Sequence, residues 1–270
     1  MILASPAQAL HLPRFEWGVG IGALRLPQYR GAKGVDDYVL PVPHVVYRGD
    51  ALRLDDEGLR GRLFESERLR LDLSLAGNVP VHDRAGGPRA GMPGLDLIVE
   101  LGPTMDATLW RSVGRGRGAH RGRWDLRLRT PVRSALSVGR PLLQQQGWVF
   151  SPSLDLRFQR GSRGVHWHAT LSAGPLYATR AYHDYFYRVK PEYATPTREA
   201  YRPDGGFSGR RTVLTVVAST RYWFWGAFAR HDRLAGAVFA DSPLVETQDY
   251  LALGLVLSRK LGWSTRGAAH

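Results

Sequence analysis

Residues 124–138 read Trp-Asp-Leu-Arg-Leu-Arg-Thr-Pro-Val-Arg-Ser-Ala-Leu-Ser-Val, a run in which apolar and polar side chains alternate. The even positions begin with Trp124 and Leu126, whereas the odd positions begin with Asp125 and Arg127. Side chains of an extended chain point alternately to its two faces, so this run predicts a β-strand with one apolar and one charged face. A sandwich core would exclude the charged face, but a hydrated barrel lumen accepts it.

The same alternation recurs along the whole chain and predicts about twelve strands. Transmembrane strands need about 9–11 residues, and several runs reach that length, whereas strands of soluble proteins usually have about 5–6. We therefore predict an all-β fold, a single antiparallel transmembrane β-barrel, with a large soluble β-sandwich as the alternative. The predicted strands cover residues 14–25, 38–48, 51–64, 67–77, 94–110, 121–138, 146–159, 164–177, 182–190, 210–220, 222–232 and 249–263.

Residues 183–211 combine an aromatic run with a loop rich in proline and glycine. Tyr185 and Tyr187 would share one face of an extended chain, which predicts the strand at 182–190. Four successive aromatic residues follow at positions 222–225. A soluble protein gains little from exposing so many rings, whereas a membrane–water interface favours them.

The chain has 270 residues and a formal net charge of +13, carried almost entirely by arginine. A basic balance suggests nucleic-acid binding. The arginines are spread along the chain instead of forming a patch, so we predict no nucleic-acid partner. An arginine-biased genome explains much of the charge, and anionic lipid head groups or an anion-attracting lumen explain the remainder. The absence of cysteine excludes disulfides and thiolate chemistry.

The N-terminal residues resemble the end of an export signal. Ala7-Gln8-Ala9 has the small-x-small form of a signal-peptidase site, but the basic region and most of the apolar core that normally precede it are missing. We interpret residues 1–9 as a residual signal-peptide segment, 10–263 as the barrel and 264–270 as a polar tail.

The alternation also assigns side chains to the lipid or to the lumen. The leucines predicted to face lipid are Leu126, Leu128, Leu154, Leu156, Leu253 and Leu255. The charged side chains predicted to face the lumen are Arg127, Arg129, Asp155 and Arg157, paired with acids such as Glu100 and Asp96.

No constellation of residues predicts catalysis or metal binding. His183 and Asp184 are neighbours, so in a strand their side chains would point to opposite faces and could not bond to each other. His166 and His168 share a face, but no third metal ligand lies near them in the sequence. We therefore predict no catalytic residue, no cofactor and no metal, and a protein that is not an enzyme.

Several short motifs are similar, in order and spacing, to those of the MipA/OmpV family of outer-membrane proteins. They include Pro27-Gln28-Tyr29-Arg30-Gly31, Pro41-Val42-Pro43, Gly91-Met92-Pro93, His183-Asp184-Tyr185, Gly205-Gly206-Phe207-Ser208-Gly209 and Asp241-Ser242-Pro243-Leu244-Val245. The resemblance implies a barrel in the cell outer membrane, surrounded by lipid and lipopolysaccharide. For the best-known member it also implies binding to a lytic murein transglycosylase and a scaffold role in peptidoglycan assembly.

Three functions stay open: a non-catalytic scaffold, an anion-preferring channel for small solutes, and a lipid A or peptide hydrolase. The strand count, with both termini in the periplasm, places residues 78–93 on the periplasmic side and residues 26–37, 111–120, 191–209 and 233–248 at the cell surface. The periplasmic span contains the segment predicted to bind a partner, which comprises Pro80, His82, Asp83 and Arg84.

Overall fold

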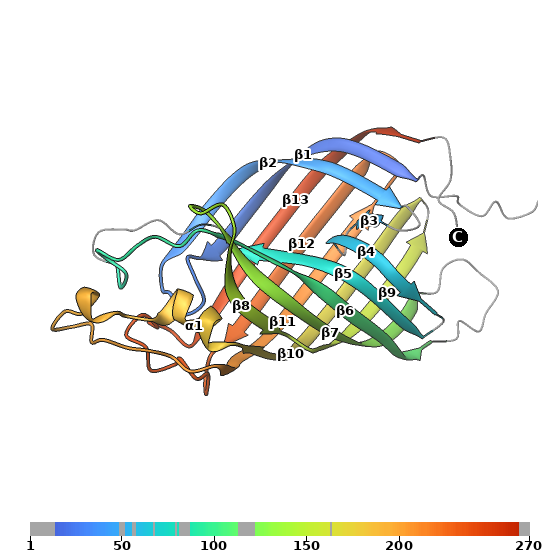
Figure 1. Ribbon diagram of the computed structural model, residues 1–270. Coiled ribbons are helices and arrows are strands. Elements are labelled where there is room, and N and C mark those ends of the chain that lie inside the picture. Colours follow the sequence, from blue (N-terminus) through green and yellow to red (C-terminus); the bar gives the residue numbers. More distant parts are fainter. Residues whose placement is uncertain are drawn as a thin grey trace, which may run out of the picture.

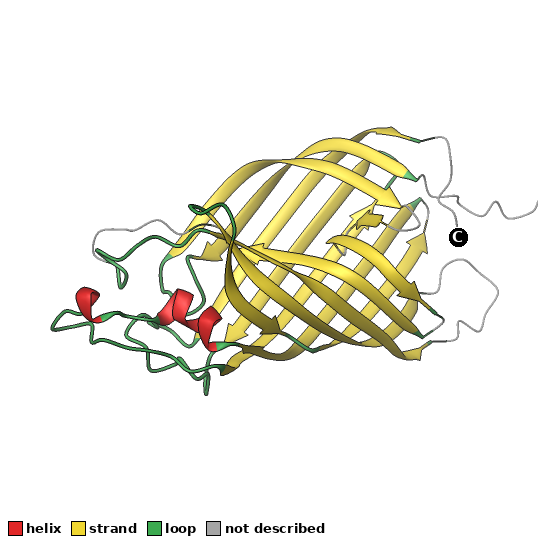
Figure 2. Cartoon of the chain, in the orientation of Figure 1, coloured by secondary structure: helices red, strands yellow, loops and turns green. Residues whose placement is uncertain are grey.

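The computed structural model describes residues 14–48, 52–55, 58–66, 68–78, 80, 87–112, 122–162 and 164–264. Figures 1 and 2 show a tilted cylinder of strands with short helices at one end, namely α1 (Arg180–Tyr187) and the 3-10 helix η1 (Pro191–Tyr193). The strands are β1 (Phe15–Pro27), β2 (Val35–Arg48), β3 (Leu52–Asp55), β4 (Gly58–Glu65), β5 (Leu69–Asn78), β6 (Leu97–Arg111), β7 (Arg123–Val138), β8 (Gln144–Phe150), β9 (Ser153–Ser162), β10 (Val165–Ala178), β11 (Gly206–Ser219), β12 (Trp223–Arg233) and β13 (Asp249–Trp263).

Antiparallel pairing continues around the whole sheet and returns to its first strand. Each strand from β1 to β7 pairs with the next, as does each from β10 to β13, and β13 pairs with β1. Both β8 and β9 lie between β7 and β10. The predicted all-β antiparallel barrel is therefore confirmed.

The thirteen strands of the described residues occupy twelve positions in the barrel, because β8 and β9 continue each other. They form the predicted strand 146–159, interrupted at Ser151 and Pro152. Proline has no N–H to donate to the strand ladder, and Pro152 faces a stretch of β7 that contains another proline, Pro131. The ladder is therefore weakest at this point.

Two strand predictions were wrong. Residues 51–64 form the hairpin β3–β4 instead of one strand, and residues 182–190 contain helix α1 (Arg180–Tyr187). The extra strand at β3–β4 reverses the direction of every later strand relative to the prediction, until the missing strand at 182–190 restores it. The strands β5 to β10 therefore run opposite to their predicted direction. The connection from β5 to β6 consequently lies at the end that carries α1 (Figure 1), and the connection from β6 to β7 lies at the opposite end, where β1 begins and β13 ends and which we call the terminal end. The prediction placed both connections at the other end.

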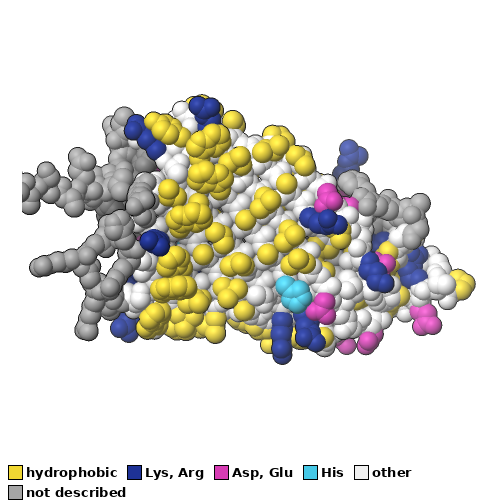
Figure 3. Space-filling view, turned by 180° about the vertical axis from the view of Figure 1, so that it is seen from behind, with side chains coloured by type: hydrophobic (Ala, Val, Ile, Leu, Met, Phe, Trp, Pro, Cys, Tyr) yellow, Lys and Arg dark blue, Asp and Glu magenta, His cyan; other side chains and the backbone are white. Residues whose placement is uncertain are grey.

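The outer surface is apolar across the middle of the barrel. Figure 3 shows hydrophobic side chains over this band, with Lys and Arg side chains at both of its ends and acidic side chains toward the end that carries α1. Exposed aromatic rings lie where strands meet the terminal end, at Phe15, Trp17, Trp110, Trp124, Trp223 and Trp263. An apolar band with an aromatic girdle is typical of a membrane barrel. In the described residues, no helix is long and apolar enough to cross a membrane.

The inner face is crowded where the first and last strands meet. Gly18, Gly20 and Gly22 point inward from β1, and a Cβ atom on Gly20 would lie 2.8 Å from the Cα of Ser258 on β13. Glycine at this position therefore allows the two backbones to pack closely.

Candidate functional site

The end of the barrel that carries α1 is covered by four connections, residues 28–34, 87–96, 179–205 and 234–248, which we call the cap (Figure 1). Their side chains form a hydrophobic core with the barrel wall. Its buried members are Tyr29, Ala32, Leu95, Ile98, Ala135, Phe186, Tyr187, Leu234, Ala237, Phe239 and Tyr250. The cap is thus packed into the mouth of the barrel and is part of its folded core.

Helix α1 carries the residues that were predicted to form an aromatic strand. Tyr182 and Phe186 lie four residues apart, as do His183 and Tyr187, so both pairs meet on one helical face. Tyr187 stacks on Phe239 with ring centroids 3.8 Å apart and planes 7° apart. The same residues also fit the alternating pattern of a strand. They form a helix because its buried face packs against the other connections of the cap and the barrel wall.

His183 joins α1 to the start of β11. Its Nδ1 lies 2.6 Å from the carbonyl oxygen of Asp204, and its Nε2 lies 2.6 Å from Oγ of Ser208. Burial lowers the pKa of His183, even though the Asp204 carbonyl favours the protonated form. The ring is therefore neutral, with Nδ1–H donating to Asp204 and Nε2 accepting the Ser208 hydroxyl proton.

The pair of Ser208 and His183 resembles a nucleophile and its base, but both side chains are buried. The group that orients the imidazole is a backbone carbonyl, and the Ser208 carbonyl accepts a hydrogen bond of 2.5 Å from Arg30. These contacts hold the cap on the barrel. Sequence reasoning missed the pair because its two members lie 25 residues apart on different elements.

Beneath the cap, three arginines surround the carboxylate of Asp232 on β12 and form ion pairs with it. Arg211 approaches it with Nε 2.8 Å and NH2 3.3 Å from the two carboxylate oxygens. Arg230 Nε lies 3.1 Å from Oδ2, and Arg30 Nε lies 3.9 Å from Oδ1. Asp232 is fully buried.

Glu100 on β6 holds the other side of this cluster. Arg133 approaches it at 3.9 Å, and the Tyr182 hydroxyl donates to it at 3.1 Å. Burial raises the pKa of Tyr182 well above its usual value, so the hydroxyl stays protonated and able to donate. Arg133 also donates from Nε to Ser74 Oγ at 3.0 Å.

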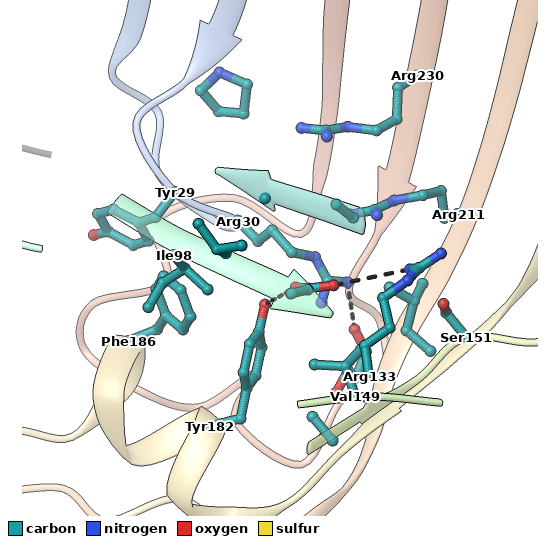
Figure 4. A pocket seen from close by; sticks show the side chains of 18 of the residues that line it. Tyr29, Arg30, Ile98, Arg133, Val149, Ser151, Tyr182, Phe186, Arg211 and Arg230 are labelled. Carbon is teal, nitrogen blue, oxygen red and sulfur yellow. Dashed lines mark hydrogen bonds and ion pairs between the residues drawn. The ribbon is translucent and has the colours of Figure 1, made fainter. Parts of the chain in front are cut away.

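A cavity of about 510 Å³ lies between the cap and these charged groups. Figure 4 shows arginines 30, 133, 211 and 230 on one side of it, and Tyr29, Ile98 and Phe186 on the other. A cavity of this size, with apolar walls and a few convergent polar groups, is typical of a small-molecule site. We take this cavity as the candidate site.

Of the charged residues singled out from the sequence, Glu100 lines this cavity, Asp96 lies outside the lumen, and the others lie elsewhere in the lumen. Arg127 and Asp125 on β7 face Asp155 and Arg157 on β9 in register, and all four side chains are buried. Arg127 lies 3.6 Å from Asp125, and Arg157 lies 3.6 Å from Asp155. These four form a band of alternating charge near the terminal end of the barrel.

The partners of the lumen arginines differ from the expected acids. Arg129 lies 3.8 Å from Asp106, and Glu100 contacts Arg133 instead. Asp96 precedes β6, is exposed, and donates its backbone N–H to the Tyr185 hydroxyl at 2.7 Å. The expected pairing with Asp96 assumed a strand that begins at residue 94, whereas β6 begins at Leu97.

The predicted partner segment is described only at Pro80, which is exposed; His82, Asp83 and Arg84 lie outside the described residues. Among the described residues, no group of three or more histidine, cysteine, aspartate or glutamate side chains is placed to hold a metal ion.

The closed sheet, its apolar outer band and its charged lumen define a membrane β-barrel, and the cap over one mouth completes its site. The chain belongs to the MipA family: residues 19–261 match the family described as MltA-interacting protein MipA. No curated protein sequence matches the chain. A crystal structure of the Pseudomonas putida toluene transporter TodX is similar over 93% of this chain and 68% of that one, at 9% identity and a TM-score of 0.25.

Proposed function

We propose that this barrel resides in the cell outer membrane and acts without catalysis, as a scaffold that holds a murein-remodelling enzyme. The observation that supports it is the cap. Phe186, Tyr187 and Phe239 are buried in the barrel mouth, and the lumen charges beneath them are engaged with one another. In a barrel through which solutes pass freely, the largest connections would not pack into a hydrophobic core across the mouth.

The family description names an interaction with MltA, which makes a lytic murein transglycosylase the proposed partner class. Barrels of this type have short periplasmic turns and long external connections. By this rule the cap lies at the cell surface, and the terminal end, with tight turns such as residues 220–222, faces the murein layer. Lipid and lipopolysaccharide are the proposed surroundings of the apolar band.

Two segments are candidates for the partner contact. The connection between β6 and β7, residues 112–122, is the longest at the terminal end and is rich in arginine. The segment with Pro80, His82, Asp83 and Arg84 lies between β5 and β6 at the cap end. We propose the first as the contact, because it faces murein when the cap faces outward.

The test compares two deletions, 115–120 and 80–88, in co-purification with a lytic transglycosylase from detergent extracts. Neither deletion removes a strand residue. We expect loss of the enzyme with the first deletion and retention with the second. The opposite result would move the contact to the cap end, and retention with both deletions would contradict the scaffold.

A channel for small anions is the second candidate, because four arginines line the cavity. A lipid A or peptide hydrolase is the third, and it would need Ser208 as its nucleophile. Ser208→Ala would abolish such hydrolysis, whereas the scaffold predicts unchanged co-purification with the transglycosylase.

A further inference from the structure

The cavity beneath the cap has an excess of buried positive charge. Its lining includes the guanidinium groups of Arg30, Arg133, Arg211 and Arg230, which come from four different elements of the barrel and cap (Figure 4). Among the described residues that line it, Glu100 is the one acid, and Asp232 lies behind three of the arginines.

Asp232 and Glu100 do not satisfy all of these donors. The two oxygens of Asp232 are shared among three guanidinium groups, and Glu100 is shared between Arg133 and Tyr182. Within the described part of the chain, Nε of Arg30 and Nε of Arg230 are buried and lie 3.9 and 3.1 Å from Asp232, but neither contact has hydrogen-bond geometry. Four guanidinium groups share two carboxylates, so the buried cluster keeps an excess of positive charge and is suited to one more anion.

The facing wall of the cavity is apolar. Ile98 and Phe186 are buried there, and the Tyr29 ring lies beside them. An inorganic anion would bind the arginines but would make no contact with this apolar wall. A ligand with an anionic group at one end and an aromatic or aliphatic group at the other would fit both sides.

We propose that the cavity binds a small organic anion, in which a carboxylate or phosphate group contacts Arg133, Arg211 and Arg230 and an apolar group packs against Ile98 and Phe186. Guanidinium groups bind both oxyanions through paired hydrogen bonds. The cavity volume of about 510 Å³ lies within the range of small-molecule sites. This site is independent of any partner at the barrel ends.

The test is calorimetric titration of the full-length protein, in detergent micelles at low salt, with four probes: benzoate, phenyl phosphate, benzyl alcohol and inorganic phosphate. We expect benzoate and phenyl phosphate to bind, and the uncharged alcohol and inorganic phosphate to bind at least about tenfold more weakly, since each lacks one half of the recognition. Whichever of the two organic anions binds more tightly identifies the preferred head group.

Arg230→Gln removes one guanidinium and leaves Asp232 paired with Arg211, so we expect benzoate binding to weaken by about tenfold. Arg129→Gln is the matched control, because Arg129 pairs with Asp106 and does not line the cavity. If Arg230→Gln does not fold, Arg133→Gln replaces it, and the rise in thermal midpoint that benzoate causes in the parent protein serves as the second measurement. Equal binding of benzoate and benzyl alcohol, equal effects of the cavity and control variants, or no binding of either organic anion would overturn the proposal.

Discussion

Lys260 Nζ lies 2.7 Å from Glu16 Oε2, and this buried ion pair joins the last strand, β13, to the first, β1. The same ammonium donates to Ser219 Oγ on β11 at 2.7 Å. The pair fixes the seam at which the barrel closes, on the inner face where glycines have brought the strands close together.

Lys260→Met should therefore weaken the barrel strongly. Removing one member of a buried ion pair leaves the other charge unpaired, at a cost of about 3–5 kcal/mol. We expect a lower midpoint in denaturant unfolding from micelles. Arg259→Met, the adjacent exposed residue, is the control and should change stability little. Similar midpoints for the two variants would show that the seam does not depend on this pair.

The cap should loosen in acid because of His183. Its pKa is lowered by burial, so the folded state binds the proton less readily than the unfolded state does. The stabilising effect of the neutral ring is then complete above the ordinary histidine pKa of about 6.5 and decreases as the pH falls below it. The protection of α1 against hydrogen exchange, measured relative to the intrinsic exchange rate at each pH, should therefore fall as the pH decreases below neutral, and by more than the protection of β13.

His183→Asn is the variant for this prediction, and exposed His166→Asn is its control. The first should exchange faster at neutral pH and lose the acid dependence, since it cannot titrate. The control should behave like the parent protein. An acid response that survives in His183→Asn would assign the effect to another group.

The free-energy cost of placing an arginine on the outer face of β13 should depend on its position along the strand. Leu255 lies near the middle of the strand and Leu261 near its end, and both are exposed on the same face. Leu255→Arg should cost about 2–4 kcal/mol in a lipid bilayer, and Leu261→Arg about 0–1 kcal/mol. A folding titration in lipid vesicles measures both values. Equal costs would place the membrane differently around the barrel.

Protease treatment of whole cells should reveal the orientation of the cap. Glu192 and Glu199 are exposed in the connection between β10 and β11, so a glutamate-specific protease should cut there in intact cells. Mass spectrometry of the fragments identifies the cleaved bonds. Cleavage that requires a breached outer membrane would place the cap in the periplasm and would favour the segment with Pro80 as the partner contact.

Alternation, together with the strand lengths and the aromatic residues at the strand ends, was sufficient to predict the barrel. Trp124, Asp125, Leu126 and Arg127 already separate an outer from an inner face, because the barrel wall imposes the same two-residue period on the side chains. The cap does not impose that period. Residues 182–187 fit both a strand, through Tyr185 and Tyr187, and a helix, through pairs four residues apart, and tertiary packing selects the helix.

The candidate site could not be predicted from the sequence, because its members are brought together by register and by the cap. Arg211 meets Asp232 because β11 and β12 pair in that register, and Arg30 reaches the same carboxylate from a connection. The spacing of Tyr182–Phe186 and of His183–Tyr187 was the sequence signal for α1, and it would have removed the wrongly predicted strand at 182–190.

If the cap closes the lumen, the barrel does not conduct ions, and conductance in planar bilayers measures this. The parent protein should show no steady current. Ala178 and Gly206 are register partners, so a short Asn-Gly turn can replace residues 179–205 without disturbing β10 and β11. That variant should conduct and should prefer anions, because of the arginines it uncovers. A steady conductance in the parent protein, unchanged by this replacement, would show that the cap does not close the lumen.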